Sequence, residues 1–158
     1  MSLEVREVDA TSPDAAALML SLDADLQARY PGAVIHGIDA DAFGSAGGIF
    51  LVGYEQGRAV ACGALRPGAD GILEVKRMFV DARARRRGHA RAMLDALEQR
   101  ARDAGAGVIR LETGDGQPEA IALYQAAGYQ RIPCYGEYAG SPHSHCFEKR
   151  LPAIDRVP

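Results

Sequence analysis

The chain has 158 residues, of which 47% are hydrophobic and 25% are charged, with a formal net charge of −3. These values suit one globular domain, which we place at residues 1–151, followed by a C-terminal tail at residues 152–158. The weakly acidic balance argues against nucleic acid or an anionic membrane as a partner. The sequence has no apolar run of bilayer length and no secretory profile at its start, so we expect a cytoplasmic protein.

The first half of the chain predicts a helix, a long loop and a strand meander. A helix is predicted to begin at Pro13 and to end before Gly32. Residues 32–48 are rich in glycine and predict a functional loop that contacts substrate, with a short helical turn opened by Asp39 and Asp41. Alternating or short apolar stretches predict strands at residues 3–8, 49–54 and 59–65.

The second half predicts a parallel strand pair around a helix. Residues 72–80 are dense in β-branched and bulky apolar side chains, as in a buried strand. Apolar residues then recur at helical spacing from Ala90 to Ala104, and Gly105 has the position of a C-cap glycine. Because residues 107–113 predict another strand, this order implies a parallel pair. The remaining predicted elements are a helix at 118–127, a strand at 129–132, a loop at 133–145 and a strand at 146–151.

The loop before the helix in the second half has the composition of an anion site. A helix start at Gly88 offers unpaired backbone N–H groups and the positive end of the helix dipole. Gly88 and Ala90 allow a pyrophosphate to approach the backbone closely. Nearby arginines add positive charge, at Arg85, Arg86, Arg87 and Arg91. Taken alone, the same pattern also fits a solvated helix start.

Two motifs resemble those of the GCN5-related N-acetyltransferase (GNAT) family. Residues 85–90, Arg-Arg-Arg-Gly-His-Ala, fit the family pattern Arg/Gln-x-x-Gly-x-Gly/Ala and follow a strand that carries Glu74. Residues 117–124, followed by Gly128-Tyr129, resemble the second hallmark, a helix that ends Leu-Tyr-x-x-x-Gly-Tyr/Phe. The resemblance implies an α/β fold with a mixed, mostly antiparallel sheet, a central splayed parallel strand pair and helices on both faces.

The resemblance also implies acetyl-CoA as the cosubstrate and indicates which residues bind it. The backbone of Met78, Phe79 and Val80 would hold the pantetheine and stabilise the thioester oxygen. Gln117 stands where many family members have asparagine, and its amide would help to hold the cofactor, next to Tyr124. The pyrophosphate would lie on the loop and helix start, at Arg85, Arg86, Arg87, Gly88, His89, Ala90 and Arg91.

Two side chains are predicted to be catalytic. By the resemblance, Tyr124 is the general acid that protonates the departing thiolate, although its helical spacing alone fits a buried aromatic residue. Glu74 is the predicted base, and Glu112 on the neighbouring strand is an alternative, as is a chain of water molecules. Without a catalytic role, Glu74 would be a surface partner of Lys76.

The predicted activity is acetyl-CoA-dependent transfer of an acetyl group to a primary amine of a small molecule, by direct attack in a ternary complex. The alternatives are a non-catalytic acyl-CoA sensor and an enzyme that acetylates a protein amine. The sequence leaves the oligomeric state open, and a homodimer is one option.

Loops 32–48 and 133–145 are predicted to bind the acceptor, because acceptor pockets of such folds are made by variable loops. Four acids are expected to form a cleft that favours a cationic amine, at Asp39, Asp41, Glu74 and Glu137. The other option is an acceptor with a carboxylate of its own, held by Arg77 or Arg131.

The cysteines and histidines predict no bound metal. The three cysteines, Cys62, Cys134 and Cys146, contain no Cys-x-x-Cys pair, and their odd number favours reduced thiols over a disulfide framework. His143 and His145 lie in a loop with too few further ligands for zinc. His36 and His89 are expected to be exposed.

Overall fold

The computed structural model describes residues 2–152, so the predicted tail at 152–158 lies, apart from Pro152, outside the described residues. The strands are β1 (Glu4–Val8), β2 (Ile49–Glu55), β3 (Arg58–Pro67), β4 (Leu73–Val80), β5 (Val108–Gly114), β6 (Gln130–Ile132) and β7 (Ser144–Arg150). They form a seven-stranded sheet in the order β1-β2-β3-β4-β5-β7-β6. Only β4 and β5 pair in parallel among these strands, which confirms the predicted mixed, mostly antiparallel sheet.

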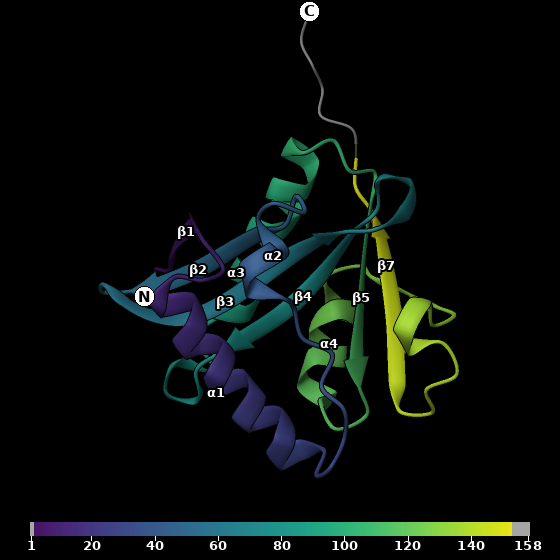
Figure 1. Ribbon diagram of the computed structural model, residues 1–158, viewed down its shortest axis with the longest axis horizontal. Coiled ribbons are helices and arrows are strands. Elements are labelled where there is room, and N and C mark those ends of the chain that lie inside the picture. Colours follow the sequence, from purple (N-terminus) through teal and green to yellow (C-terminus); the bar gives the residue numbers. More distant parts are fainter. Residues whose placement is uncertain (1, 153–158) are drawn as a thin grey trace, which may run out of the picture.

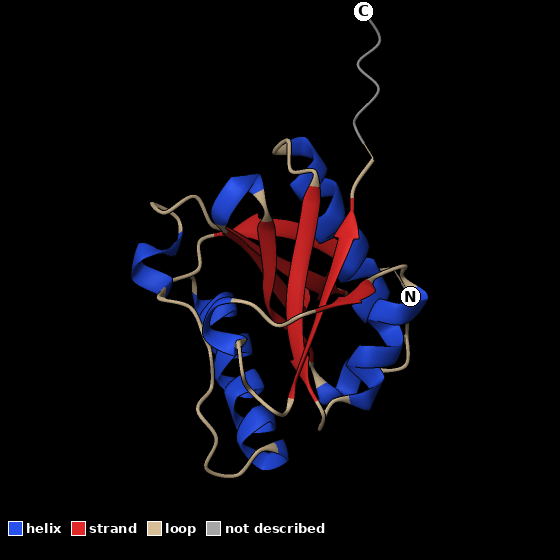
Figure 2. Cartoon of the chain, turned by 90° about the vertical axis from the view of Figure 1, so that its right-hand side faces the viewer, coloured by secondary structure: helices blue, strands red, loops and turns tan. Residues whose placement is uncertain are grey.

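Helices cover both faces of the sheet, as predicted (Figure 1, Figure 2). The helices are α1 (Pro13–Arg29), α2 (Ala40–Phe43), α3 (His89–Asp103) and α4 (Pro118–Ala126). On one face α3 and α4 pack on a core that includes Leu51, Leu97 and Leu111. On the other face α1 and α2 pack on a second core that includes Phe50 and Val52. No helix among residues 2–152 has the length and apolar composition needed to cross a membrane.

Local sequence signals explain where the helices begin and end. Ser12 caps α1 by accepting a hydrogen bond from the Ala15 N–H, and Pro13 occupies the first turn, where no donor is needed. Asp39 caps α2 in the same way. At the two ends of α3, Gly88 and Gly105 have φ angles of +78° and +82°, a left-handed conformation that favours glycine. The sequence therefore predicted these boundaries to within about two residues.

The central parallel pair separates soon after it forms. The register pairs Leu73 with Ile109 and ends at Val75 with Leu111, so β4 and β5 are unpaired beyond this point among the described residues. In β4 a bulge follows, because Arg77 has a φ of +57° and the register with β3 shifts nearby. The splayed pair that was predicted is thus present, and the bulge lies directly beyond its last paired residues.

The structure contains a disulfide between Cys134 and Cys146, so the prediction of reduced thiols was wrong for these two residues. The strand register explains the pairing. Ile132, in β6, pairs with Cys146 in β7, and Cys134 follows two residues after the end of the strand, where its Cα lies 5.2 Å from that of Cys146. The bond closes the loop before β7 into a ring. Cys62 is free and fully buried, as expected of a core residue.

A buried carboxylate outside the sheet centre joins α3 to the far edge of the fold. Glu98 is 4% exposed and accepts hydrogen bonds from the Tyr129 hydroxyl and the Lys149 ammonium, each at 2.9 Å. Both partners come from the C-terminal third of the chain. Glu98 therefore fixes α3, whose N-terminus carries the predicted anion site, relative to β7.

We predict that Glu98→Ala lowers the free energy of unfolding by about 3 kcal/mol, because it leaves a buried hydroxyl and a partly buried ammonium without their acceptor. Urea denaturation measures this loss. Gln99→Ala, at the neighbouring exposed position of α3, is the control and should cost less than about 0.5 kcal/mol. Equal losses for the two variants would show that Glu98 is not an anchor.

Candidate active site

A cavity of about 360 Å³ opens where β4 and β5 separate. Leu22 and Leu26 of α1 supply part of an apolar wall. Lys76 of β4 and Glu112 of β5 supply charged groups, and Ser144 comes from the start of β7. The volume lies at the lower end of the range of about 300–1,000 Å³ that is typical of ligand pockets. The cavity therefore suits a small molecule or one end of a larger one.

The charged groups in this cavity are held by hydrogen bonds. Glu112 accepts a hydrogen bond of 2.6 Å from the Ser144 hydroxyl. The Lys76 ammonium donates to the Tyr138 hydroxyl at 2.7 Å and to the His36 carbonyl at 2.9 Å. Burial lowers the pKa of Lys76, because it disfavours the charged form. These contacts join both predicted acceptor loops to the splayed strands.

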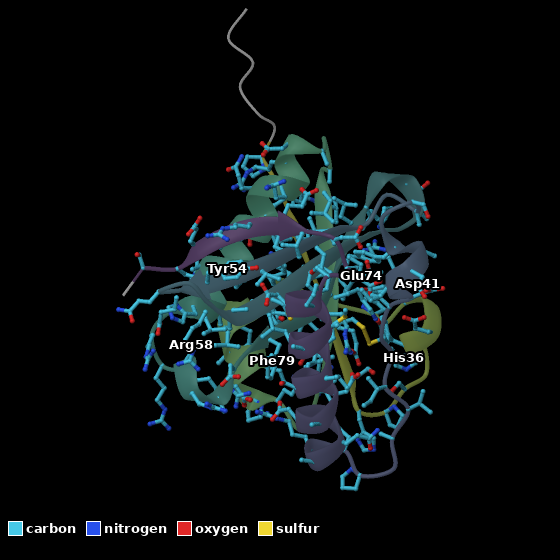
Figure 3. All side chains as sticks on the ribbon, turned by 60° about the vertical axis from the view of Figure 1, so that its left-hand side comes forward. His36, Asp41, Tyr54, Arg58, Glu74 and Phe79 are labelled. Carbon is cyan, nitrogen blue, oxygen red and sulfur yellow. A yellow bond between two sulfur atoms is a disulfide. The ribbon has the colours of Figure 1, made fainter. Side chains whose placement is uncertain are left out.

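Glu74 lies on β4 but is turned into a buried network. It is 6% exposed, accepts a hydrogen bond of 2.9 Å from the Tyr138 hydroxyl and forms an ion pair of 2.5 Å with Arg66. Figure 3 shows Glu74 and His36 on the same side of α1. The alternative of a surface pair between Glu74 and Lys76 is wrong, because Glu74 is buried and its ion-pair partner is Arg66.

The four acids expected to form an acidic cleft do not line the cavity. Glu137 contacts Arg66 at 3.0 Å and Lys76 at 3.7 Å, which neutralises its charge. Asp39 accepts hydrogen bonds from the first backbone N–H groups of α2 and so serves as a helix cap. Glu112 is the carboxylate that faces the cavity. The acidic cleft was therefore wrong in its residues, because nearby cations and a helix start take up these charges.

Tyr124 lies in the core beside the strand separation. Its side chain is 5% exposed and packs against the rings of Tyr129 and Phe147. Burial raises the pKa of Tyr124, and the negative charge of Glu112 raises it further. The phenol therefore keeps its proton at neutral pH, which a proton donor requires.

The predicted pyrophosphate loop has an open helix start. Gly88 is the N-cap residue of α3, has no side chain to cap the first N–H groups, and has free space around the position of a Cβ. Arg85 donates to the Val80 carbonyl at 3.0 Å, and Arg91 pairs with Asp95 on the surface of α3. Arg86 has no ion-pair partner among residues 2–152.

Two further members of this loop contact Glu55 at the end of β2. One Glu55 carboxylate oxygen accepts a hydrogen bond from Arg87, and the other is hydrogen-bonded to Nε2 of the His89 ring. His89 is 3% exposed, so the prediction that it is exposed was wrong. His89 lies in the first turn of α3 next to the β2–β3 hairpin, and the Glu55 carboxylate draws it inward. Because Arg87 is paired with Glu55, its side chain is less available to bind phosphate than the sequence predicted.

Gln117 is held by two hydroxyl groups at the start of α4. The Tyr30 and Thr113 hydroxyls each lie 3.3 Å from the Gln117 amide oxygen, which accepts from them. Tyr30 also accepts a hydrogen bond of 3.0 Å from the Gly116 N–H. The amide nitrogen of Gln117 is left to donate elsewhere. No sequence signal indicated Tyr30, which reaches this site from the end of α1.

His143, just before β7, and His145, within β7, are not arranged as a metal site in the described part of the chain. His143 lies 3.0 Å from Asp115, and His145 contacts the same carboxylate. Within the part of the chain that the structure describes, no three His, Cys, Asp or Glu residues are grouped as metal ligands. These contacts instead tie the loop before β7 to the end of β5.

Comparison with known proteins identifies the family. A sequence profile of the acetyltransferase (GNAT) family matches residues 17–129. The chain belongs to this family. A protein from Azospirillum brasilense named IAA acetyltransferase is 37% identical over 135 residues, which cover 85% of this chain and 88% of that protein.

Solved structures agree with this assignment. A Klebsiella pneumoniae protein assigned as an acyl-CoA N-acyltransferase has a TM-score of 0.80 and 32% identity, and the match covers 94% of this chain and 97% of that chain. A GNAT acetyltransferase from Elizabethkingia anophelis, solved with acetyl-CoA bound, has a TM-score of 0.70 and 15% identity, with coverage of 94% and 98%. The second likeness shows the shared GNAT fold. The structure is thus that of a GNAT acetyltransferase domain, as the two sequence motifs implied.

We predict that Gly88→Asp weakens the binding of acetyl-CoA at least about 10-fold, because it places a negative charge at the helix start where the phosphates are expected. Aspartate is strained at the φ of +78° that Gly88 adopts, so folding of the variant is checked by thermal unfolding. Isothermal titration calorimetry measures the dissociation constant. Gly105→Asp is the control, since this glycine has a similar φ and equally free space at the other end of α3. Equal affinities for the two variants would contradict the placement of the phosphates.

Proposed function

We propose that this GNAT protein is an acetyl-CoA-dependent N-acetyltransferase that acetylates a primary amine of a small molecule by direct attack in a ternary complex. The observation that carries the proposal is the placement of two ionisable groups beside the strand separation. Glu112 faces the cavity, and the pKa of Tyr124 is raised by its burial and further by the Glu112 charge. One group can accept a proton and the other can donate one.

The residues present fit acetyl-CoA as the cosubstrate. The uncapped start of α3 at Gly88 has room for phosphate oxygens, and Arg85, Arg86 and Arg91 lie on the same loop and first turn. The edge of β4 that faces β5 has no strand partner beyond Val75 among the described residues, so its backbone is free for a pantetheine. A bound acetyl-CoA would supply the thioester. Its binding residues are those predicted from the sequence, with Arg87 engaged by Glu55.

The reaction forms a C–N bond and breaks a C–S bond. The neutral amine attacks the thioester carbonyl, and the backbone of Met78, Phe79 and Val80 would stabilise the charge that develops on the oxygen. The amine loses one proton to a base, and the departing thiolate takes a proton from Tyr124. The products are the acetylated amine and the free thiol. No acetylated side chain is required.

We assign the base to Glu112 in preference to Glu74. Glu112 faces the cavity and has one hydrogen bond to Ser144, which leaves its other oxygen without a hydrogen-bond partner among residues 2–152. Glu74 is buried, and Arg66 and Tyr138 occupy its oxygens. Both Glu74 oxygens are therefore engaged, whereas one Glu112 oxygen is left to accept a proton.

A non-catalytic acyl-CoA sensor and an enzyme for protein amines are the competing functions. Release of free thiol from acetyl-CoA in the presence of a library of small amines tests the proposal. Amine-dependent release above the rate of spontaneous hydrolysis supports an enzyme. Tight binding of acetyl-CoA without any release would support the sensor, and release with peptides alone would support a protein acceptor.

We expect Tyr124→Phe to lower kcat by about 10²-fold, because it removes the proton donor and keeps the packing of the ring. Affinity for acetyl-CoA should change little. Steady-state kinetics with a good acceptor gives both values. Tyr129→Phe is a suitable comparison, since that hydroxyl contacts Glu98 in the core rather than the cavity. A Tyr124→Phe enzyme as fast as the wild type would make Tyr124 a packing residue only.

Substitution of the two glutamates separates their roles. Glu112→Gln should lower kcat/KM by about 10²-fold, whereas Glu74→Gln should act mainly on stability, because it weakens the buried contact with Arg66. For the wild type, kcat/KM should rise through the neutral range as the amine loses its proton. Kinetics and thermal unfolding of both variants are measured together. A larger kinetic loss for Glu74→Gln would return the role of base to Glu74.

A further inference from the structure

Resting on the proposed function, we propose that the acceptor is a zwitterion of the amino-acid class, with an amine, a carboxylate and an apolar side chain. The motivating feature is the charge of the cavity beyond the last paired residues of β4 and β5. Lys76 and Glu112 directly follow the pair Val75 and Leu111 and place opposite charges on the same side of the sheet. A ligand that carries both charges matches this arrangement.

Each of these two charged groups has a hydrogen-bonding position left for a ligand. The Lys76 ammonium has three donors, of which two are used by Tyr138 and His36. The next acceptor, a Glu137 oxygen, lies 3.7 Å away, which is too long for a hydrogen bond. Glu112 likewise uses one oxygen for Ser144. A ligand carboxylate could accept the third Lys76 hydrogen bond, and a ligand amine could donate to the second Glu112 oxygen.

The other cations considered for the acceptor carboxylate are less well placed; the buried Arg77 Nε has no hydrogen-bond partner among residues 2–152, but the guanidinium is held through its Nη2. The Arg77 guanidinium donates to Asp23 at 2.6 Å and to the Met19 carbonyl at 3.1 Å. His143 contacts Asp115. Arg131, the other arginine considered from the sequence, is exposed on β6 and is not part of the cavity lining. Lys76 is therefore the cation best placed to meet an acceptor carboxylate.

The apolar wall gives the third feature of the acceptor. Leu22, Leu26, Val34 and Ile35 line the side of the cavity formed by α1 and the loop that follows it. Val34 is 82% exposed, so part of this apolar wall is open to water. An apolar substituent on the acceptor would remove part of this surface from water. The cavity volume of about 360 Å³ has room for an acceptor of roughly the size of one amino acid.

The test compares amino acids with the amines that lack only the carboxylate, in a thiol-release assay at saturating acetyl-CoA. The pairs are L-leucine with 3-methylbutylamine and L-phenylalanine with 2-phenylethylamine. For at least one pair we expect kcat/KM to be about 10-fold or more higher for the amino acid. Equal or higher values for the simple amines would overturn the zwitterion and leave the N-acetyltransferase standing. No release with any amine would overturn the proposed function as well.

Lys76→Met tests the residue, because methionine has a similar length and no charge. The substitution should raise KM for the amino acid, with a smaller effect on kcat. The ratio of kcat/KM for the amino acid to kcat/KM for its paired amine should then fall to about one. The paired amines differ in their own pKa values, but this difference is the same for both enzymes. An unchanged ratio in a folded Lys76→Met protein, with folding checked by circular dichroism, would overturn the role of Lys76.

Arg131→Met is the matched control, since it removes an exposed cation outside the cavity and should leave the ratio unchanged. A loss of the ratio in this variant would transfer the carboxylate contact to Arg131 and overturn the assignment to Lys76. If Lys76→Met does not fold, the comparison of paired substrates with the wild type still decides whether the acceptor is a zwitterion.

Discussion

The early end of pairing between β4 and β5 is the constraint on which the site depends. After Val75 and Leu111 the two strands no longer share hydrogen bonds, yet β4 still pairs with β3 and β5 with β7. The strands therefore diverge without leaving the sheet, and the backbone facing the gap needs partners from water or ligand. The bulge at Arg77 turns β4 at the same place. A cavity, a backbone edge and the charged side chains of both strands meet there because of this one interruption.

Ion pairs and hydrogen bonds among the charged side chains around the gap determine which of them are available to a ligand. Glu74 and Glu137 share Arg66, and Tyr138 connects Glu74 to Lys76 through its hydroxyl. Such a network costs desolvation, and it is stable because its members satisfy one another. It holds the disulfide-closed loop before β7 against the sheet. The acids of this network are thus engaged by their neighbours, whereas Glu112 has one hydroxyl partner and a second oxygen without a hydrogen-bond partner among residues 2–152.

The sequence predicted the fold class and the order of elements well, because hydrophobic period, capping residues and turn glycines are local signals. It did not predict the Cys134–Cys146 bond, since the proximity of these residues depends on the register of β6 with β7. The buried contact of His89 with Glu55 likewise joins positions 34 residues apart. The choice between Glu74 and Glu112 required knowledge of Arg66, which lies on β3. The motifs predicted a site near these strands, but only the packing distinguished a carboxylate with an ion-pair partner from one without.

The end of α1 links the apolar wall of the cavity to Gln117, a residue predicted to contact the cofactor. The Tyr30 hydroxyl crosses from α1 to the turn between β5 and α4, where it contacts Gly116 and Gln117. A Cβ at Gly116 would lie 3.0 Å from the Tyr30 ring, so a side chain there would displace it. Arg29 strengthens the same junction by donating to the Gly116 carbonyl at 2.9 Å. Because α1 also supplies Leu22 and Leu26 to the cavity wall, a shift of this helix would change the acceptor wall and the Gln117 amide together. The two halves of the site are therefore positioned by one helix, although they lie far apart in the sequence.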